Sequence, residues 1–188
     1  MSQLHIVGFA GSASRPSRTR NLVEGIAEAI ASRVPAAVSI FDPHDVHPTL
    51  GATLDPRQAT GKLRELFDAI RGADALVVGS PVYKGTYSGQ FKHLFDLVEP
   101  NALKGKPVVL SATGGSQLHA LALDHGMRPL FAFFSADIIP TAIYATEAEF
   151  ADYRAANSNL IARIDRAAEE LSWRFGEPRA ALPIARIA

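Results

Sequence analysis

Two kinds of hydrophobic pattern alternate along this chain. Short, nearly continuous apolar runs predict buried strands, and longer stretches with an apolar residue at every third or fourth position predict amphipathic helices. The strand-like runs are residues 4–11, 37–41, 75–83, 106–115 and 137–146. The helical periods cover residues 17–33, 63–70, 88–98, 118–136 and 147–175. A polar, proline-rich stretch at residues 42–56 interrupts the alternation and is expected to be a loop.

This alternation predicts one α/β domain, in which a parallel sheet is covered by helices on both faces. The first, third and fourth strands are apolar at nearly every position, which is typical of strands buried on both sides. The 188 residues suffice for one domain with a sizeable core. We expect the domain to span residues 1–175 and a C-terminal tail to follow at residues 176–188.

Loops with a ligand-binding character follow the first, third and fourth strands. They read "GSASRPSRTRN" from Gly11, "SPVYKGTYSG" from Ser80 and "ATGGSQLHA" from Ala112. Sheets of this kind bind ligands beyond the carboxyl ends of their strands, where the strand order switches. The three loops are therefore expected to meet in one crevice.

The first loop indicates an anion site. It brings a glycine, four hydroxyl side chains and three arginines to the start of a predicted helix. The free N–H groups of a helix N-terminus attract phosphate, and arginines add charge-assisted hydrogen bonds. Helix capping needs only one hydroxyl and does not account for the whole set. The loop matches neither a Walker motif nor G-x-G-x-x-G, so the phosphate of a ligand smaller than a dinucleotide, such as FMN, fits better.

The second and third loops are suited to a flat ring. Pro81 fixes the backbone of the second loop, and Gly85 and Gly89 allow a ring to approach closely. The third loop offers the backbone N–H groups of Gly114 and Gly115, which stabilise negative charge on a reduced flavin. Taken alone, either loop is equally well explained as a strand-to-helix turn, in which Gly and Ser are common.

The composition excludes several classes of function. The 19 basic and 19 acidic residues give a formal net charge of zero, so no charged field draws the chain to nucleic acid or to an anionic membrane. The absence of cysteine rules out disulfides, zinc–thiolate sites, iron–sulfur clusters and thiol catalysis. We find no signal peptide and no apolar run of membrane-spanning length, which favours a cytoplasmic protein.

Longer motifs at the three loops resemble the NAD(P)H-dependent FMN reductases of the flavodoxin-like fold. The motifs are "GSASRPSRTRNL", "SPVYKGTYSGQFKHLFDLV" and "ATGGSQLHALALDHGMRPLFAFF". With "YATEAEFADYR", they are most similar to the reductase component of two-component alkanesulfonate and methanesulfonate monooxygenases, over residues 4–175. The resemblance implies a five-stranded sheet of order 2-1-3-4-5 and hydride transfer from NADPH or NADH to FMN. It further implies release of reduced FMN to a separate FMNH2-dependent monooxygenase of sulfur metabolism, and a homodimer or homotetramer.

Residue by residue, the resemblance implies binding positions but no catalytic acid or base. The FMN phosphate would be held by Ser12, Ser14, Ser17, Arg18, Thr19 and Arg20. The flavin ring would lie between Pro81, Val82, Tyr83, Lys84 and Ser88 on one side and Thr113, Gly114, Gly115 and Ser116 on the other. His119 is included as a residue that either touches the flavin loop or only caps a helix start. Because hydride passes directly between two stacked rings, no catalytic residue is named.

His125 has two interpretations. Some relatives carry tyrosine here, in a helix with a one-residue π-type insertion at the subunit contact, and such insertions often lie at functional sites. Gly126 and Pro129 also disfavour a regular helix at this point. His125 therefore either modulates how readily FMN exchanges or is an interface histidine with satisfied hydrogen bonds.

Three other features have simpler explanations than a site. The acids and histidines of "DPHDVHP" at residues 42–48 lack the spacing of a common metal site, so we expect a solvated loop and no metal. The phenylalanines at residues 131–134 are expected in the core or against another subunit. Trp173 is expected in the core.

Two alternative functions stay open. A related enzyme would keep FMN bound and reduce a quinone or an azo compound with it. A flavodoxin-like electron carrier would have no nicotinamide activity; such carriers tend to be strongly acidic, whereas this chain is neutral and its first loop is basic. The choice between NADH and NADPH is also open, because no site for a 2′-phosphate is recognisable.

Overall fold

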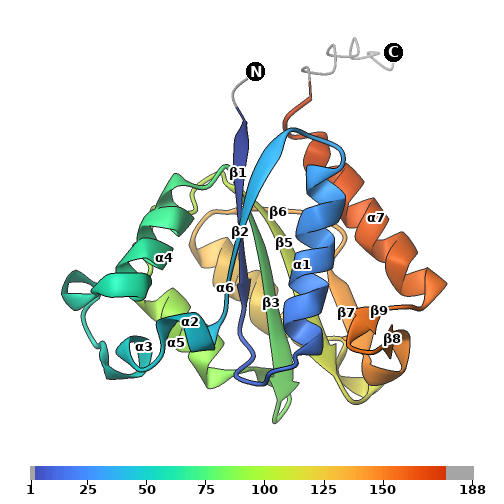
Figure 1. Ribbon diagram of the computed structural model, residues 1–188, viewed down its shortest axis with the longest axis horizontal. Helices are drawn as coiled ribbons and strands as arrows, with labels where there is room; N and C mark the ends of the chain where they lie inside the picture. Colours follow the sequence, from blue (N-terminus) through green and yellow to red (C-terminus); the bar gives the residue numbers. More distant parts are fainter. Residues whose placement is uncertain (1–2, 177–188) are drawn as a thin grey trace, which may run out of the picture.

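A parallel sheet forms the centre of the protein, and helices cover both of its faces (Figure 1). The computed structural model describes residues 3–176. The parallel strands of the sheet are β1 (Leu4–Ala10), β2 (Ala36–Phe41), β3 (Ala75–Tyr83), β5 (Pro107–Gly114), β6 (Asp137–Ile138) and β7 (Ile143–Thr146). Their order is β2-β1-β3-β5, with β6 and β7 both parallel to β5. The predicted order 2-1-3-4-5 is confirmed, because β6 and β7 together take the place of the fifth strand.

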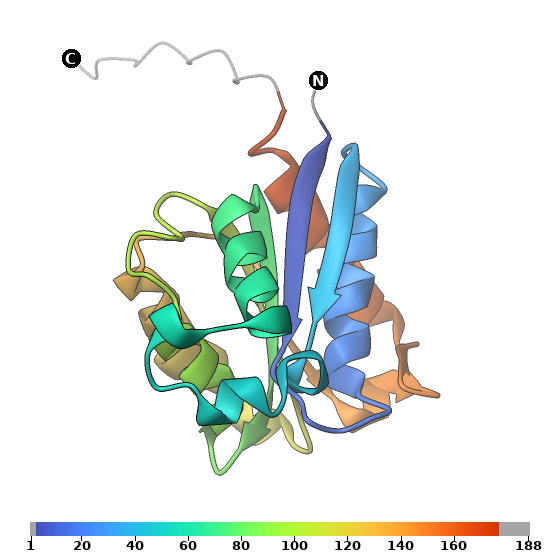
Figure 2. The ribbon, with the colours of Figure 1, turned by 60° about the vertical axis from the view of Figure 1, so that its left-hand side comes forward.

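Different helices cover the two faces of the sheet (Figures 1 and 2), and the two faces bury different cores. The helices are α1 (Arg18–Ala31) and α7 (Ser158–Ser172) on one face, and α4 (Gly61–Gly72), α5 (Gly89–Leu97) and α6 (Arg128–Phe133) on the other. The α1–α7 face is filled mainly by aliphatic side chains. The opposite face holds a cluster of aromatic rings, in which the centroid of Phe95 lies 4.9 Å from that of Phe91 and 4.8 Å from that of Phe131.

The stretch at residues 42–56 is not simply a loop. It contains α2 (Pro43–Val46) and α3 (Thr49–Ala52), and η1 (Pro56–Gln58) begins at its last residue. Asp42 caps α2 and Asp55 caps η1, and each is followed by a proline at the first helical position. Pro43 and Pro56, which indicate a loop in the sequence, are therefore helix-start signals, since Pro is tolerated at the first position of a helix.

The predicted helix at residues 118–136 is broken. The structure has η2 (Gln117–His119), a π-helix η3 (Leu123–Met127), and then α6. The irregularity expected near Gly126 is confirmed. A Cβ on Gly126 would lie 3.0 Å from Thr86 Oγ1 and 3.2 Å from Tyr87 Cε1, so η3 packs closely on β4 (Thr86–Tyr87).

The last strand and helix also differ from their predictions. Residues 137–146 form two strands rather than one, with Pro140 between them, because proline has no N–H for the ladder. The expected helix at residues 147–175 is wrong over its first third. That part forms η4 (Glu147–Glu149) and an antiparallel hairpin of β8 (Phe150–Ala151) and β9 (Arg154–Ala155), and Asn157 caps the true start of α7.

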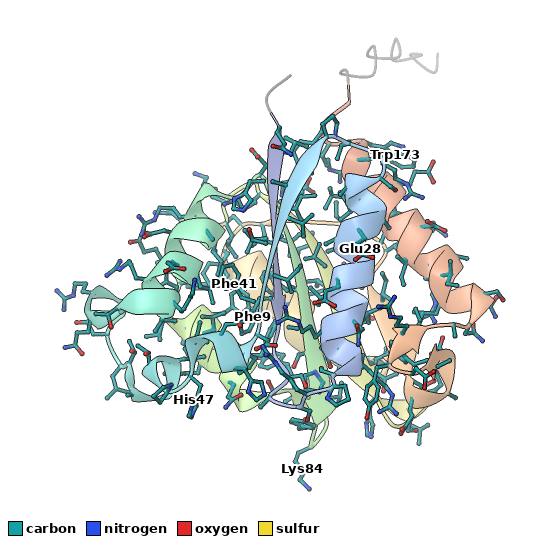
Figure 3. The ribbon with its side chains drawn as sticks, in the orientation of Figure 1. Phe9, Glu28, Phe41, His47, Lys84 and Trp173 are labelled. Atoms are coloured by element: carbon teal, nitrogen blue, oxygen red, sulfur yellow. The ribbon has the colours of Figure 1, made fainter. Side chains whose placement is uncertain are left out.

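Some predictions of burial are also corrected. Trp173 is 60% exposed, at the end of α7 farthest from the loop that carries Lys84 (Figure 3), so it is not a core residue. Phe131 and Phe134 are buried as expected, whereas Phe133 is 71% exposed. The predicted tail lies almost wholly outside the described residues, and the domain boundary stays a prediction. Within residues 3–176, no helix combines the length and apolar character needed to cross a bilayer.

Candidate functional site

The loops after β1, β3 and β5 meet at the carboxyl edge of the sheet. They surround a cavity of about 210 Å³, the carboxyl-edge cavity, and the segment after β7 adds two residues to its wall. Its lining comprises Ser12, Ser14, Pro16, Ser17, Arg18, Thr19, Pro81, Val82, Tyr83, Thr113, Gly114, Gly115, Glu147 and Tyr153. The expected crevice is thus present in the structure.

Hydrogen-bond donors line the cavity where α1 begins. Ser17 caps the helix, and its side chain accepts a hydrogen bond from Arg20 N at 3.2 Å. Ser12 Oγ accepts from Ser14 N at 3.3 Å. Among the described residues, neither hydroxyl donates its own hydrogen, so both remain available to a ligand. Two buried hydroxyls beside a helix N-terminus form a donor set that suits an anion.

Arg18 is the cationic side chain of the cavity lining. Its guanidinium forms an ion pair with Glu147 of η4. The same group lies 5.0 Å from the ring centroid of Tyr153, in the turn between β8 and β9, at cation–π distance. Arg18 is therefore held at the cavity from two directions by residues of the segment that follows β7.

The other two arginines of the first loop bind Asp42 instead. Arg20 Nη1 and Arg15 Nη2 lie 2.7 and 2.8 Å from Asp42 Oδ2, and Arg20 Nε lies 2.8 Å from Glu24 Oε1. Burial raises the pKa of Asp42, but the hydrogen bonds from Arg20 and Arg15 outweigh it and hold the pKa below its ordinary value. Arg20 is outside the lining of the cavity, and its predicted contact with phosphate stays a prediction.

Other side chains of the segment that begins at Asp42 also contact the first loop. Asp45 also pairs with Arg15 and Arg20, each at 3.4 Å, and His44 Nε2 is hydrogen-bonded to Ala13 O at 2.7 Å. These side chains therefore fix the first loop. In the described residues, no group of three or more acidic or histidine side chains is placed to bind a metal.

The second loop contributes one wall of the cavity and a hairpin tip. Pro81, Val82 and Tyr83 line the cavity. Lys84 and Gly85 have φ values of 53° and 91°, which is the two-residue turn that matches the twist of β3 and β4. Figure 3 shows Lys84 at the tip of this turn, directed away from the body of the protein. Lys84 is not part of the lining.

Ser88 connects two loops rather than lining the cavity. Its hydroxyl donates to Gly11 O at 2.7 Å and accepts from Phe91 N at 3.2 Å, as the cap of α5. Its N–H donates to Ser80 Oγ at 2.9 Å. The buried Ser88 thereby ties the second loop to the first.

The third loop approaches the first through a pair of buried hydroxyls. Thr113 Oγ1 and Thr19 Oγ1 are 2.7 Å apart. A Cβ on Gly114 would lie 2.2 Å from the Tyr144 hydroxyl, which donates to Ser116 O at 2.6 Å, so only glycine fits there. Burial raises the pKa of Tyr144, which keeps this donor protonated.

The remaining predicted residues lie beside the cavity. Ser116 caps η2, where its side chain accepts from Leu118 N at 3.2 Å, and His119 is an exposed residue of the same turn. His125 is exposed on the π-helix. Neither Ser116 nor the two histidines line the cavity, and both interpretations of His125 stay predictions.

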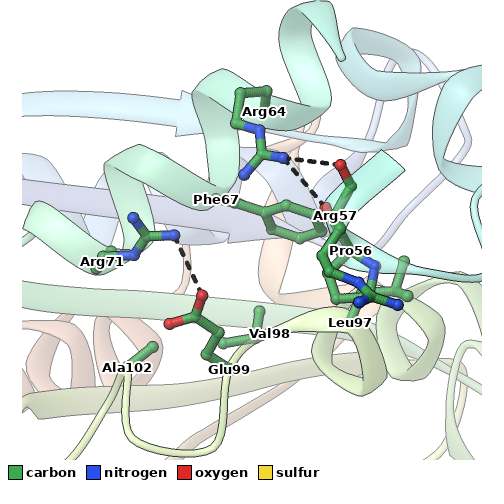
Figure 4. Close-up of a pocket in the computed structure, with 9 residues that line it drawn as sticks. All are labelled: Pro56, Arg57, Arg64, Phe67, Arg71, Leu97, Val98, Glu99 and Ala102. Atoms are coloured by element: carbon green, nitrogen blue, oxygen red, sulfur yellow. Dashed lines mark hydrogen bonds and ion pairs between the residues drawn. The ribbon is translucent and has the colours of Figure 1, made fainter. Parts of the chain in front are cut away.

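A second cavity of about 170 Å³, the α4–α5 cavity, contains three arginines (Figure 4). Arg64 donates to the carbonyl oxygens of Pro56 and Arg57 at 3.4 and 3.3 Å, and Arg71 donates to Glu99 at 3.5 Å. Its lining has no serine, threonine or glycine. Arg64 and Arg71 therefore hold neighbouring parts of the protein together, and no hydroxyl side chain lines the cavity beside them.

Sequence reasoning did not select Pro16, Glu147 or Tyr153. Glu147 directly follows β7, so the rule that identified three loops at strand ends also applies to this one. The sequence pattern predicts a helix from residue 147, so a fourth loop after this strand was not considered.

Comparisons with known proteins show the family of this chain. The family model described as NADPH-dependent FMN reductase matches residues 4–150. The chain is 44% identical to an FMN reductase (NADPH) of Pseudomonas aeruginosa, over 98% of this chain and 99% of that protein. It is also 44% identical to the NADH-dependent FMN reductase SfnF of Pseudomonas fluorescens, over 92% of each.

Solved structures agree as well. An oxidoreductase from Corynebacterium diphtheriae superposes with a TM-score of 0.82 at 33% identity, over 91% of this chain and 96% of that one. The apo form of the NADH:FMN oxidoreductase EMOB gives a TM-score of 0.84 at 28% identity, over 94% and 92%. The chain belongs to the NADPH-dependent FMN reductase family and is an oxidoreductase that uses reduced nicotinamide and FMN.

Proposed function

We propose that the carboxyl-edge cavity binds FMN as an exchangeable substrate, with its phosphate at the start of α1. The observation that carries this proposal is the position of Arg18, which lies in the cavity wall beside the capped helix N-terminus. The hydroxyls of Ser12 and Ser17 supply further donors. A charged guanidinium, helix N–H groups and hydroxyls together form a site for a phosphate dianion.

The proposal assigns the flavin ring to the space between the second and third loops. Pro81 to Tyr83 form one wall, and Thr113 to Gly115 form the other. The site of a Cβ on Gly115 has no atom within 4 Å, so its backbone is open to a flat ring. Bound nicotinamide supplies a hydride and FMN accepts it; the protein holds the two rings in contact and in orientation.

Arg15 and Arg20 receive a different role in this proposal from Arg18. Both are bound to the buried Asp42, so they anchor the loop that carries Ser12 and Ser14. Of the three arginines, Arg18 alone then contacts the phosphate directly. The sequence-based prediction assigns both Arg18 and Arg20 to the phosphate, whereas this proposal assigns only Arg18.

We further propose that reduced FMN leaves for a separate monooxygenase, of the sulfonate type that the sequence resembles, in the cytoplasm. The two named relatives use NADPH and NADH respectively, so the proposal does not favour either nicotinamide. The protein would act as a homodimer or homotetramer. Leu118, Leu121 and Phe133 are 88%, 59% and 71% exposed around η2, η3 and α6, which supports a subunit contact there.

Steady-state oxidation of NADH and NADPH with varied free FMN tests whether flavin is a substrate. Saturation with added FMN, and little activity without it, is the expected result. Activity that needs no added FMN but requires a quinone would instead favour a bound-flavin reductase. Failure to oxidise either nicotinamide would favour an electron carrier.

A further inference from the structure

We assign the guanidinium of Arg18 to the FMN phosphate, but in the structure it is already paired with Glu147. Glu147 is the acidic side chain of the carboxyl-edge cavity lining, and Arg18 is the basic one. The two form an ion pair, so the lining carries no net charge. Without Glu147 the lining would carry one positive charge. A phosphate that approaches Arg18 therefore meets a carboxylate in the same place.

Of the two partners of Arg18, Glu147 is the one free to leave. Its side chain is 67% exposed and can turn into solvent. Tyr153 is held by the β8–β9 turn, where Asp152 and Tyr153 have φ values of 46° and 65°. Two consecutive non-glycine residues in the left-handed region are uncommon and mark a constrained turn. Tyr153 can thus keep the guanidinium in place while its anionic partner changes.

We propose that Glu147 sets the affinity for FMN by competing with the flavin phosphate for Arg18. This inference rests on the proposed function, because it needs the phosphate to bind at Arg18. The carboxylate must give up its ion pair when FMN binds, and it re-forms the pair when FMN leaves. Since a carboxylate and a phosphate dianion repel each other at close range, both do not share one guanidinium at full strength.

The competition distinguishes flavins that carry a phosphate from those that do not. Flavin phosphates must displace Glu147, whereas riboflavin has no phosphate and leaves the Arg18–Glu147 pair intact. Glu147 therefore weakens the binding of FMN but not of riboflavin. Weak retention is useful to an enzyme whose reduced flavin has to leave for another protein.

The test is a fluorescence titration of FMN and of riboflavin with purified protein and with Glu147→Gln. The variant keeps the size of the side chain but removes its charge. We expect the FMN dissociation constant to fall about fivefold, the scale of an exposed ion pair, and that of riboflavin to stay unchanged. Stopped-flow dissociation of FMN should slow by a similar factor.

Two controls make the assignment specific. Asp152→Asn removes the same charge from the same exposed segment, and Asp152 forms no ion pair in the described part of the chain; FMN affinity should not change. In the Arg18→Ala background, Glu147→Gln should no longer tighten FMN binding. All three substituted positions are exposed or half-exposed, so folding is not at risk.

The outcomes distinguish the phosphate site at Arg18 from the competition by Glu147. Unchanged FMN binding in Arg18→Ala would remove the phosphate site itself. If Arg18→Ala weakens FMN binding but Glu147→Gln does not tighten it, only the competition is refuted. Equal tightening by Asp152→Asn would also refute it, because that would show a general effect of charge. Tightening of riboflavin as well would refute it too, because that effect would not act through the phosphate.

Discussion

The carboxyl-edge cavity and the α4–α5 cavity each contain an arginine paired with a glutamate, yet they differ in everything around that pair. Arg18 and Glu147 lie among backbone N–H groups, buried hydroxyls and glycines. Arg71, near the end of α4, and Glu99, just after α5, lie in a cavity lined also by Phe67 and other apolar side chains. Arginine in a cavity is common to both, so it does not distinguish a binding site from a structural contact.

The two cavities differ in the hydrogen-bond donors that surround the arginine. At the carboxyl edge, parallel strands end together and the loops that follow must satisfy helix N-termini, so donors accumulate there. Along the sides of α4 and α5, the backbone is satisfied within each helix. An anion entering the α4–α5 cavity would find only side chains that already have partners.

The largest expected effect separates the two arginines directly. Arg18→Ala should raise the FMN dissociation constant tenfold or more, because a hydrogen bond to a charged group contributes about 1.5–3 kcal/mol. Arg71→Ala, the matched change in the α4–α5 cavity, should leave it within about twofold, since it removes only an exposed pair. Flavin fluorescence titration measures both. Equal effects would mean that the cavities do not differ as described.

The second prediction separates Arg18 from its neighbours in the first loop. Asp42→Asn should lower the free energy of unfolding by about 2 kcal/mol near neutral pH, because Arg15 and Arg20 lose a buried charged acceptor. Its effect on FMN affinity should be much smaller than that of Arg18→Ala. A loss of FMN binding without a loss of stability would contradict the anchoring role.

The difference in unfolding free energy between the wild type and Asp42→Asn should depend on pH. Because the pKa of Asp42 is lowered in the folded protein, its stabilising contribution is present above the ordinary carboxyl pKa of about 4. It is lost as the pH falls through the lower, folded-state value. Urea unfolding between about pH 6 and pH 3 should therefore show the wild type and Asp42→Asn converging at the acidic end. Glu170, whose pKa is also lowered, contributes acid sensitivity to both proteins.

The third prediction concerns the contact that brings the first and third loops together. Thr19→Val keeps the shape of the side chain but leaves the hydroxyl of Thr113 without its buried partner. We expect a loss of about 1–2 kcal/mol in unfolding free energy. The double variant with Thr113→Val should recover part of this loss, because no polar group is then left alone. Purely additive losses in chemical denaturation would argue against the contact.

The sequence predicts the parts of this protein that local pattern controls. The apolar runs identify β1, β3 and β5 nearly to the residue, and the rule for strand ends then places three loops at one cavity. The pattern does not distinguish Arg18 from Arg20. Their difference depends on Asp42, which lies after another strand and is brought near only by the folded sheet.

The segment after β7 was missed for a different reason. Its residues, "EAEFADYRAA", are rich in good helix formers, so propensity alone favours a helix. The structure instead uses a capping box between Thr146 and Glu149 and a hairpin whose turn has two positive φ values. A turn of this type normally contains glycine or asparagine, so Tyr153 gives no sign of it in the sequence.

The smallest expected effect tests why a tyrosine is kept in that turn. Tyr153→Asn suits the left-handed backbone better, so it should not lower the melting temperature. It removes the ring beneath Arg18, and an exposed cation–π contact contributes about 0.5–1 kcal/mol, so FMN affinity should fall by about twofold to fivefold. Riboflavin affinity serves as the control and should change less. If Tyr153→Asn instead binds FMN as tightly as the wild type, Arg18 is positioned by Glu147 and the helix alone, and the constrained turn has no role in binding.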